Sequence, residues 1–294
     1  MSSPLRQGVI ILGMHRSGTS ALAGALARLG FAMPSTPLEP SADNPEGFYE
    51  SRVIVEMNFK ILTALEAAWN LCFGITPAEL PARFSPAQSE VLYRLLHGEF
   101  GDARSFVLKD PRMCLLLPLW LPALRRLVPS LPVLLMLRHP AEIVTSHITR
   151  NQRPEPETIF NWLHHMLEAE YMSRTMRRGI LLYDDLLRDW HATLAPALRS
   201  AGITPPLTLQ DAAPALDKFI APGMRHHQAR DPSARIGPPE AASLADTTWR
   251  ALCTLARNPQ DMLALAVLDD ARANLTIMRH ELMRRGERVI LPPI

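Results

Sequence analysis

The chain has 294 residues, of which 47% are hydrophobic, and its 31 lysine and arginine residues are nearly balanced by 29 aspartate and glutamate residues. This length favours one large domain over two equal ones. A net charge of +2 without a long block of like charges argues against a nucleic-acid partner. The three cysteines are widely spaced and form no CxxC motif, so we expect reduced thiols and a cytoplasmic protein. The N-terminal apolar run is too short for a signal peptide or a membrane span, so we expect no targeting segment.

The first predicted element is a buried parallel strand over residues 9–12, a short apolar run rich in β-branched residues. A polar turn between Gly13 and Gly18 follows, and apolar residues then recur at helical spacing until Gly30. A helix N-terminus offers unpaired backbone N–H groups and a partial positive charge, so the turn is a candidate phosphate site. The alternative is that Ser17 only caps the helix and that Arg16 is a solvated loop residue.

Two families share this arrangement of strand, loop and helix. Residues 13–20 match the P-loop signature G-x-x-x-x-G-K-[ST], except that Thr19 stands where the lysine should be. The run Arg16-Ser17-Gly18-Thr19-Ser20 instead resembles the [KR]-S-G-T-[ST] loop of sulfotransferases that use 3′-phosphoadenosine 5′-phosphosulfate (PAPS). The resemblance implies that the loop holds the 5′-phosphate and that Arg16 bridges phosphate and sulfate. The loop residues expected to bind the cofactor are His15, Arg16, Ser17, Gly18, Thr19 and Ser20.

A second strand and helix follow at residues 132–150. The predicted strand 133–137 ends at Arg138, and Pro140 suits the first turn of a helix that carries Ser146. An arginine at a strand end followed eight residues later by a serine resembles the 3′-phosphate motif of the same family. Arg138 would present a fork of donors to the phosphate, and Ser146 would add a hydroxyl two helical turns further on. The alternative for Arg138 is a surface ion pair with Glu142.

Residues 31–51 form a Pro- and Ser-rich loop before a predicted helix with apolar positions from Ile54 onward. Within this loop, residues 44–50 resemble the NPxGYFE segment of bacterial sulfotransferases that also begin with GMHRSGTS. Sulfuryl transfer to a hydroxyl needs a base near the acceptor oxygen, and a carboxylate can serve. Glu50 and Glu46 are the candidates, and we prefer Glu50 because it belongs to the motif. The alternative is that Glu50 is a first-turn helix residue favoured by the helix dipole.

The predicted strand 105–108 ends in Lys109-Asp110-Pro111-Arg112, and this KDPR segment again resembles the sulfotransferases. Lys109 could neutralise charge on the sulfuryl group or on the departing phosphate. Asp110 is expected to be a structural partner for a nearby base or helix start. An NTPase would instead need Asp110 as a ligand for Mg²⁺.

The predicted fourth strand, residues 180–182, leads into Tyr183-Asp184-Asp185-Leu186, which is similar to the YEDL segment of many sulfotransferases. That resemblance places Tyr183 near the adenine, whereas the alternative is a core aromatic side chain. Residues 205–239 are rich in proline and are expected to be irregular. By analogy with a late basic loop of the family, Arg225 is expected to close over the 3′-phosphate.

The remaining pattern predicts three helices: residues 89–100, residues 154–178, and a final long helix capped by Asn258-Pro259 with apolar positions that include Leu263 and Ala266. His164 and Glu168 share a face of the second helix, but no further ligands at metal-binding spacing accompany them, so no metal site is expected.

The predicted fold is therefore α/β, with a P-loop-like, mostly parallel central sheet flanked by helices and a helical and irregular C-terminal part. We expect a single domain over 1–294, with the α/β core at 8–190 and with the closing loop and C-terminal helices at 200–294. The resemblance implies a PAPS-dependent sulfotransferase that produces 3′-phosphoadenosine 5′-phosphate (PAP). Its acceptor would be a carbohydrate, a glycolipid or a small natural product. The alternatives are a P-loop kinase or NTPase with a degenerate Walker A motif and a nucleotide-binding scaffold without activity.

Overall fold

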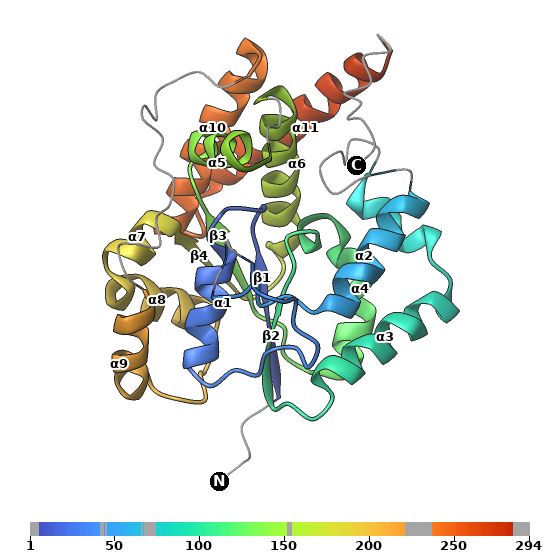
Figure 1. Cartoon of the computed structure of the whole chain (residues 1–294). Helices are drawn as coiled ribbons and strands as arrows, with labels where there is room; N and C mark the ends of the chain where they lie inside the picture. The colour runs from blue at the N-terminus through green and yellow to red at the C-terminus, as the bar shows by residue number, and fades with distance from the viewer. Residues whose placement is uncertain are drawn as a thin grey trace.

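The computed structural model of the chain describes residues 6–41, 44, 46–65, 67, 75–151, 155–220 and 237–284. Its centre is a sheet of four parallel strands in the order β2-β1-β3-β4 (Figure 1). The strands are β1 (Gln7–Leu12), β2 (Ser105–Lys109), β3 (Val133–Leu137) and β4 (Arg178–Leu182). The predicted α/β fold with a parallel sheet is confirmed.

Helices cover both faces of the sheet because successive side chains of each apolar strand point to opposite faces. In β1, Val9 and Ile11 enter the core on one face, and Ile10 and Leu12 enter the core on the other. The first face is covered by α1 (Thr19–Arg28), α7 (Tyr183–Arg188), α8 (Trp190–Ser200) and α9 (Leu209–Phe219). The larger core on the second face includes residues of α2 (Arg52–Ala64), the 3₁₀-helix η1 (Pro77–Arg83), α3 (Pro86–Phe100), α4 (Met113–Leu127), α5 (Pro140–Asn151), α6 (Glu155–Ser173), α10 (Pro239–Arg257) and α11 (Met262–Arg284).

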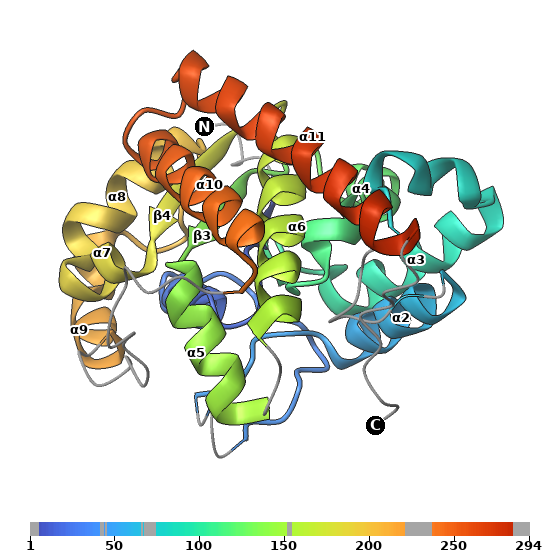
Figure 2. The same cartoon turned by 90° about the horizontal axis from the view of Figure 1, so that it is seen from above.

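The last two helices pair with each other and both pack against α6 (Figure 2). They share the larger core with the strands, since Leu252 of α10 and Leu268 of α11 belong to the same buried cluster as Ile10 of β1. No helix of the described segments is both long and apolar enough to cross a membrane.

The expectation of an irregular segment over residues 205–239 is wrong for α9. Thr208 caps this helix, because its Oγ1 accepts a hydrogen bond of 3.1 Å from the Asp211 backbone N–H. The buried stripe of α9 includes Leu216 and Phe219, and the Phe219 ring packs so closely against Gly24 of α1 that a side chain there would clash with it. Pro214, which lies inside the helix, and the neighbouring prolines hide this amphipathic pattern in the sequence.

Two helix boundaries also differ from the prediction. The helix expected over 154–178 ends at Ser173, and Arg178 begins β4 instead. The final helix is capped by Asp261, whose Oδ1 accepts a 2.9 Å hydrogen bond from the Ala264 N–H, rather than by Asn258-Pro259. The shifted start changes which face is buried, so Leu263 is 76% exposed. The buried stripe is Ala264, Leu268, Ala271 and Leu275.

Candidate active site

The candidate site lies at the carboxyl edge of the sheet, where ligands bind in open parallel α/β sheets. The loop over residues 13–18 follows β1, and three other predicted site residues end or follow the remaining strands. Lys109 is the last residue of β2, Arg138 follows β3, and Tyr183 follows β4. The parallel sheet therefore brings four sequence-distant motifs to one edge.

The loop after β1 adopts the backbone that its two glycines permit. Gly18 is the N-cap of α1 with φ 89°, and no side chain caps this helix. Ser17 is therefore not a capping residue. Its hydroxyl is fully buried and makes no hydrogen bond to any described residue. A buried polar group without a partner is costly, so this hydroxyl is a donor available to a ligand.

Arg16 and Tyr183 shape the two sides of this loop. Arg16 has φ 71°, a left-handed conformation that is rare outside glycine and that clusters at functional sites. Tyr183 is buried against Gly18, where any Cβ would clash with the tyrosine ring. The Arg138 guanidinium carbon lies 4.9 Å from the centre of the same ring. Tyr183 thus lies against the loop and also beside Arg138.

A direct hydrogen bond joins the two predicted phosphate motifs, because Arg16 Nε donates to Ser146 Oγ at 2.9 Å. Arg16 is therefore not a solvated loop residue. Arg138 Nη1 donates to the Arg16 carbonyl at 3.0 Å, and Arg138 Nε donates to Glu142 Oε2 at 2.8 Å. The ion pair with Glu142 does form, but both residues are buried rather than at the surface.

Lys109 connects the loop to the predicted base. Its Nζ donates to Ser20 Oγ at 3.2 Å, to the Phe48 carbonyl at 3.0 Å and to Glu50 Oε1 at 2.5 Å. Glu50 precedes Ser51, the N-cap of α2, so it is not a first-turn residue of that helix. A lysine and a carboxylate are thus held next to a hydroxyl of the phosphate loop.

Glu46 lies elsewhere. Its side chain is 57% exposed and pairs with Arg28 at 3.3 Å, whereas the side chain of Glu50 is only 6% exposed. Of the two base candidates, only Glu50 contacts Lys109.

Asp110 has a structural environment. Its Oδ1 accepts from Arg112 Nη1 at 2.7 Å and from the Arg112 backbone N–H at 2.9 Å, just before α4 begins. Its Oδ2 accepts from Asn58 Nδ2 at 2.8 Å, and the Asn58 Oδ1 in turn accepts from Trp120 Nε1 at 2.9 Å. Both carboxylate oxygens are therefore engaged by side chains of the protein.

Sequence reasoning assigned no role to Arg112, although it lies inside the KDPR segment. Its Nη1 also lies 3.5 Å from Glu50 Oε2, so Arg112 joins the Asp110 network to the candidate base. Asn58 was overlooked as well, although it is a polar residue at a buried position of α2 between Ile54 and Ile61. A polar residue within an apolar helical stripe is the signal that could have identified it.

Three histidine rings lie close to one another. The His15 and His165 rings are 6.4 Å apart, and those of His164 and His165 are 6.5 Å apart. Burial, followed by the charge of Arg112, lowers the pKa of His15 well below its ordinary value. Burial is also the main cause that lowers the pKa of His164 to about 3 and that of His165 to about 4. All three imidazoles are therefore neutral at pH 7.

Among the residues that the structure describes, no group of three His, Cys, Asp or Glu side chains is placed to hold a metal ion. Glu168, which shares a helix with His164, pairs with Arg272 at 2.7 Å. Cys114 and Cys253 are free thiols, and Cys114 Sγ accepts a hydrogen bond from the Gly13 N–H at 3.2 Å. Arg225 and Cys72 lie outside the described residues.

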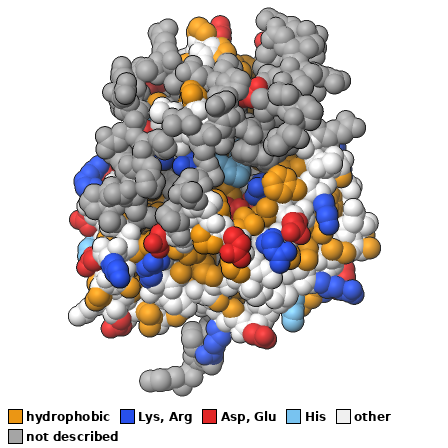
Figure 3. Space-filling view, in the orientation of Figure 1, with side chains coloured by type: hydrophobic (Ala, Val, Ile, Leu, Met, Phe, Trp, Pro, Cys, Tyr) orange, Lys and Arg blue, Asp and Glu red, His pale blue; other side chains and the backbone are white. Residues whose placement is uncertain are grey.

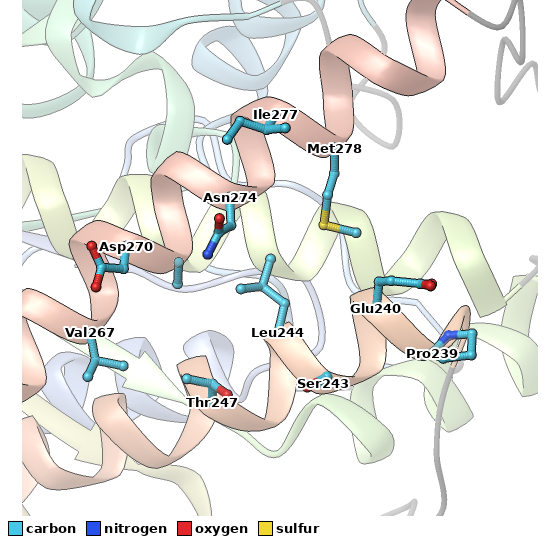
Figure 4. Close-up of a pocket in the computed structure, with 11 residues that line it drawn as sticks. Pro239, Glu240, Ser243, Leu244, Thr247, Val267, Asp270, Asn274, Ile277 and Met278 are labelled. Atoms are coloured by element: carbon cyan, nitrogen blue, oxygen red, sulfur yellow. The ribbon is translucent and has the colours of Figure 1, made fainter.

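A separate groove of about 710 Å³ lies between α10 and α11. Leu244, Asn274 and Met278 point into the space between the two helices (Figure 4). None of the predicted site residues that the structure describes lines this groove. On the face seen in Figure 3, acidic and basic side chains are interspersed, as the nearly balanced composition suggests.

No protein-family model matches the chain, and no curated protein matches it. Among solved structures, the chain is similar to a sulfotransferase domain from the curacin biosynthetic pathway, with 17% identity, coverage of 69% of this chain and 76% of that one, and a TM-score of 0.41. It is also similar to a sulfotransferase domain from the Synechococcus PCC 7002 olefin synthase, with 15% identity, coverage of 97% and 96%, and a TM-score of 0.42. Likenesses this distant carry no functional assignment.

Proposed function

We propose that the chain is a PAPS-dependent sulfotransferase that transfers a sulfuryl group to a hydroxyl acceptor. The observation that carries this proposal is the hydrogen bond between Arg16 and Ser146. These residues belong to two motifs that resemble the 5′- and 3′-phosphate sites of one family, and they are 130 positions apart in the chain. Their contact supports a single site for one ligand that carries both phosphates.

The chemistry of the donor groups fits such a ligand. The Ser17 hydroxyl is buried and has no partner in the part of the chain that the structure describes, and the loop lies at the N-terminus of α1, where anions are favoured. The loop residues 15–20 would hold the 5′-phosphosulfate end, Arg138 and Ser146 would hold the 3′-phosphate, and Tyr183 would lie near the adenine. Arg225 remains a proposed contributor from outside the described residues.

PAPS, when bound, supplies the sulfuryl group together with a phosphate leaving group. In the proposed mechanism, Lys109 and Arg16 would neutralise the negative charge that accumulates on the oxygen between the sulfuryl group and the leaving phosphate. Glu50 takes the proton of the acceptor hydroxyl. Lys109 Nζ donates a hydrogen bond to Glu50 Oε1 in the structure. Reorientation of the Lys109 side chain toward the donor would free this oxygen to accept the proton of the acceptor hydroxyl.

The kinase alternative receives no support from the geometry. Asp110, which would have to bind Mg²⁺, has both oxygens engaged by Arg112 and Asn58. Thr19 also occupies the position of the P-loop lysine that reaches the β- and γ-phosphates.

A calorimetric titration with PAP and with ATP, each with and without Mg²⁺, tests the proposal. We expect PAP to bind preferentially and without metal. Mg²⁺-dependent ATP binding with no response to PAP would overturn the sulfotransferase proposal. PAP binding without any turnover of PAPS over a broad panel of acceptors would instead favour a nucleotide-binding scaffold.

A further inference from the structure

Arg112 is a buried cation whose guanidinium donates hydrogen bonds to described residues from one side only. Its Nη1 makes every hydrogen bond of the group to described residues, to Asp110 at 2.7 Å and to Glu50 at 3.5 Å. Its Nε is buried and has no hydrogen-bond partner among the described residues. Nε and Nη2 form the edge that binds carboxylates, phosphates and sulfates through two parallel hydrogen bonds. That edge is therefore unused.

The charge on Arg112 is secure despite its burial. Burial alone would lower its pKa, but the Asp110 and Glu50 carboxylates outweigh that effect and raise the pKa of Arg112 above its ordinary value. The side chain is only 8% exposed, and its guanidinium carbon lies 4.4 Å from the centre of the Phe59 ring. In such a dry position, a hydrogen bond from a cation to an anion is stronger than at the surface.

The position of Arg112 suggests which ligand would use this edge. Contacts run from the phosphate loop at Ser20 to Lys109, on to Glu50, and from there to Arg112 and Phe59. Arg112 thus contacts the carboxylate oxygen of Glu50 that Lys109 does not contact, and its charge also acts on His15 of the loop. Phe59 is 39% exposed and can offer part of its ring to an apolar or flat group. An acceptor hydroxyl at Glu50 would place the rest of the acceptor beside these two residues.

We propose that Arg112 and Phe59 form an acceptor subsite for an oxyanion, so that the enzyme selects a hydroxyl acceptor that also carries a carboxylate or similar oxyanion on a flat or apolar framework. The Nε edge of Arg112 binds the oxyanion, and Phe59 packs against the framework. The role of the hydroxyl rests on the proposed function, whereas the contact between Arg112 and the oxyanion does not.

The test compares 4-hydroxybenzoate with its neutral analogue 4-hydroxybenzamide by calorimetry at neutral pH, both with and without saturating PAP. We expect the acid to bind about 10- to 100-fold more tightly than the amide, which is the usual contribution of a hydrogen bond to a charged group. Equal affinities, or no binding of either compound, would overturn the subsite. This comparison needs no variant and can be interpreted even if PAP fails to bind, in which case only the proposed function falls.

Two variants locate the effect. Arg112→Lys keeps the positive charge but lacks the fork, so in folded protein, checked by circular dichroism, it should bring the acid close to the affinity of the amide while PAP affinity stays near the wild-type value. Phe59→Leu changes an exposed side chain and should weaken both compounds to a similar degree, leaving their ratio intact. If Arg112→Lys folds and retains the full preference for the acid, Arg112 is not the oxyanion site.

Discussion

Glu50 Oε1 and Lys109 Nζ lie 2.5 Å apart, although the two residues are separated by 59 positions in the sequence. Both side chains are buried at the carboxyl edge of the sheet, and Lys109 also reaches Ser20 in the first turn of α1. The contact is possible because β1 and β2 are parallel neighbours, so that the loop after β1 and the end of β2 meet at one edge. Glu50 enters from the segment that precedes α2.

Glu50→Gln tests the proposed base. The amide preserves the shape of the side chain and can still accept a hydrogen bond from Lys109, but it cannot take a proton. We expect PAP affinity to be unchanged and PAP release from PAPS in the presence of an acceptor to fall about 10²- to 10⁴-fold. Glu46→Gln is the matched control, since Glu46 is exposed and pairs with Arg28, and it should retain activity. Activity lost in the control but kept in Glu50→Gln would reverse the assignment.

Arg138→Ala tests the proposed 3′-phosphate site. Truncating one partner of a buried, charged hydrogen bond costs about 2–5 kcal/mol, so PAP should bind more weakly by that amount. Adenosine 5′-phosphate, which lacks the 3′-phosphate, should lose much less affinity in the same variant. Calorimetry with both nucleotides measures the difference. Unchanged PAP affinity, or equal losses for the two nucleotides, would remove Arg138 from the site.

Ser17→Ala separates a ligand-binding hydroxyl from a helix cap. Replacing a true capping serine by alanine costs about 0.5–2 kcal/mol of stability. Here the hydroxyl does not cap α1 and makes no hydrogen bond within the described segments, so we expect denaturant unfolding to show no loss of stability in the variant. PAP affinity should fall by about 1.5–3 kcal/mol, because a hydrogen bond to a charged group is lost. Reduced stability with unchanged PAP binding would contradict the proposal.

The strands and the edge where they meet could be predicted from the sequence because each apolar run is followed directly by a polar, chemistry-bearing residue. Arg138 after β3 and Lys109 at the end of β2 are examples. The parallel pairing of these strands then places such residues together without any knowledge of distances.

The contacts within the site could not be predicted in the same way. The choice between Glu46 and Glu50 depends on the path of an irregular loop, and only the structure shows that Glu50 turns inward to Lys109. The role of Arg112 could not be predicted because it depends on a hydrogen-bond network with Asp110 and Asn58, which come from different elements. The α9 helix was missed because the helix signal of the Thr208 cap was outweighed by surrounding prolines.

The buried histidines predict a marked loss of stability in mild acid. His164 and His165 have folded-state pKa values of about 3 and about 4, whereas the unfolded chain titrates near 6.5. Between about pH 6.5 and pH 4 the unfolded state binds more protons than the folded state, so the free energy of unfolding falls as the pH falls. From pH 7 to pH 5 each residue should lower the free energy of unfolding by about 2 kcal/mol.

Urea unfolding at both pH values measures the total loss of stability. His164→Gln should reduce this pH dependence. An equally steep pH dependence in His164→Gln would show that other groups cause the acid sensitivity.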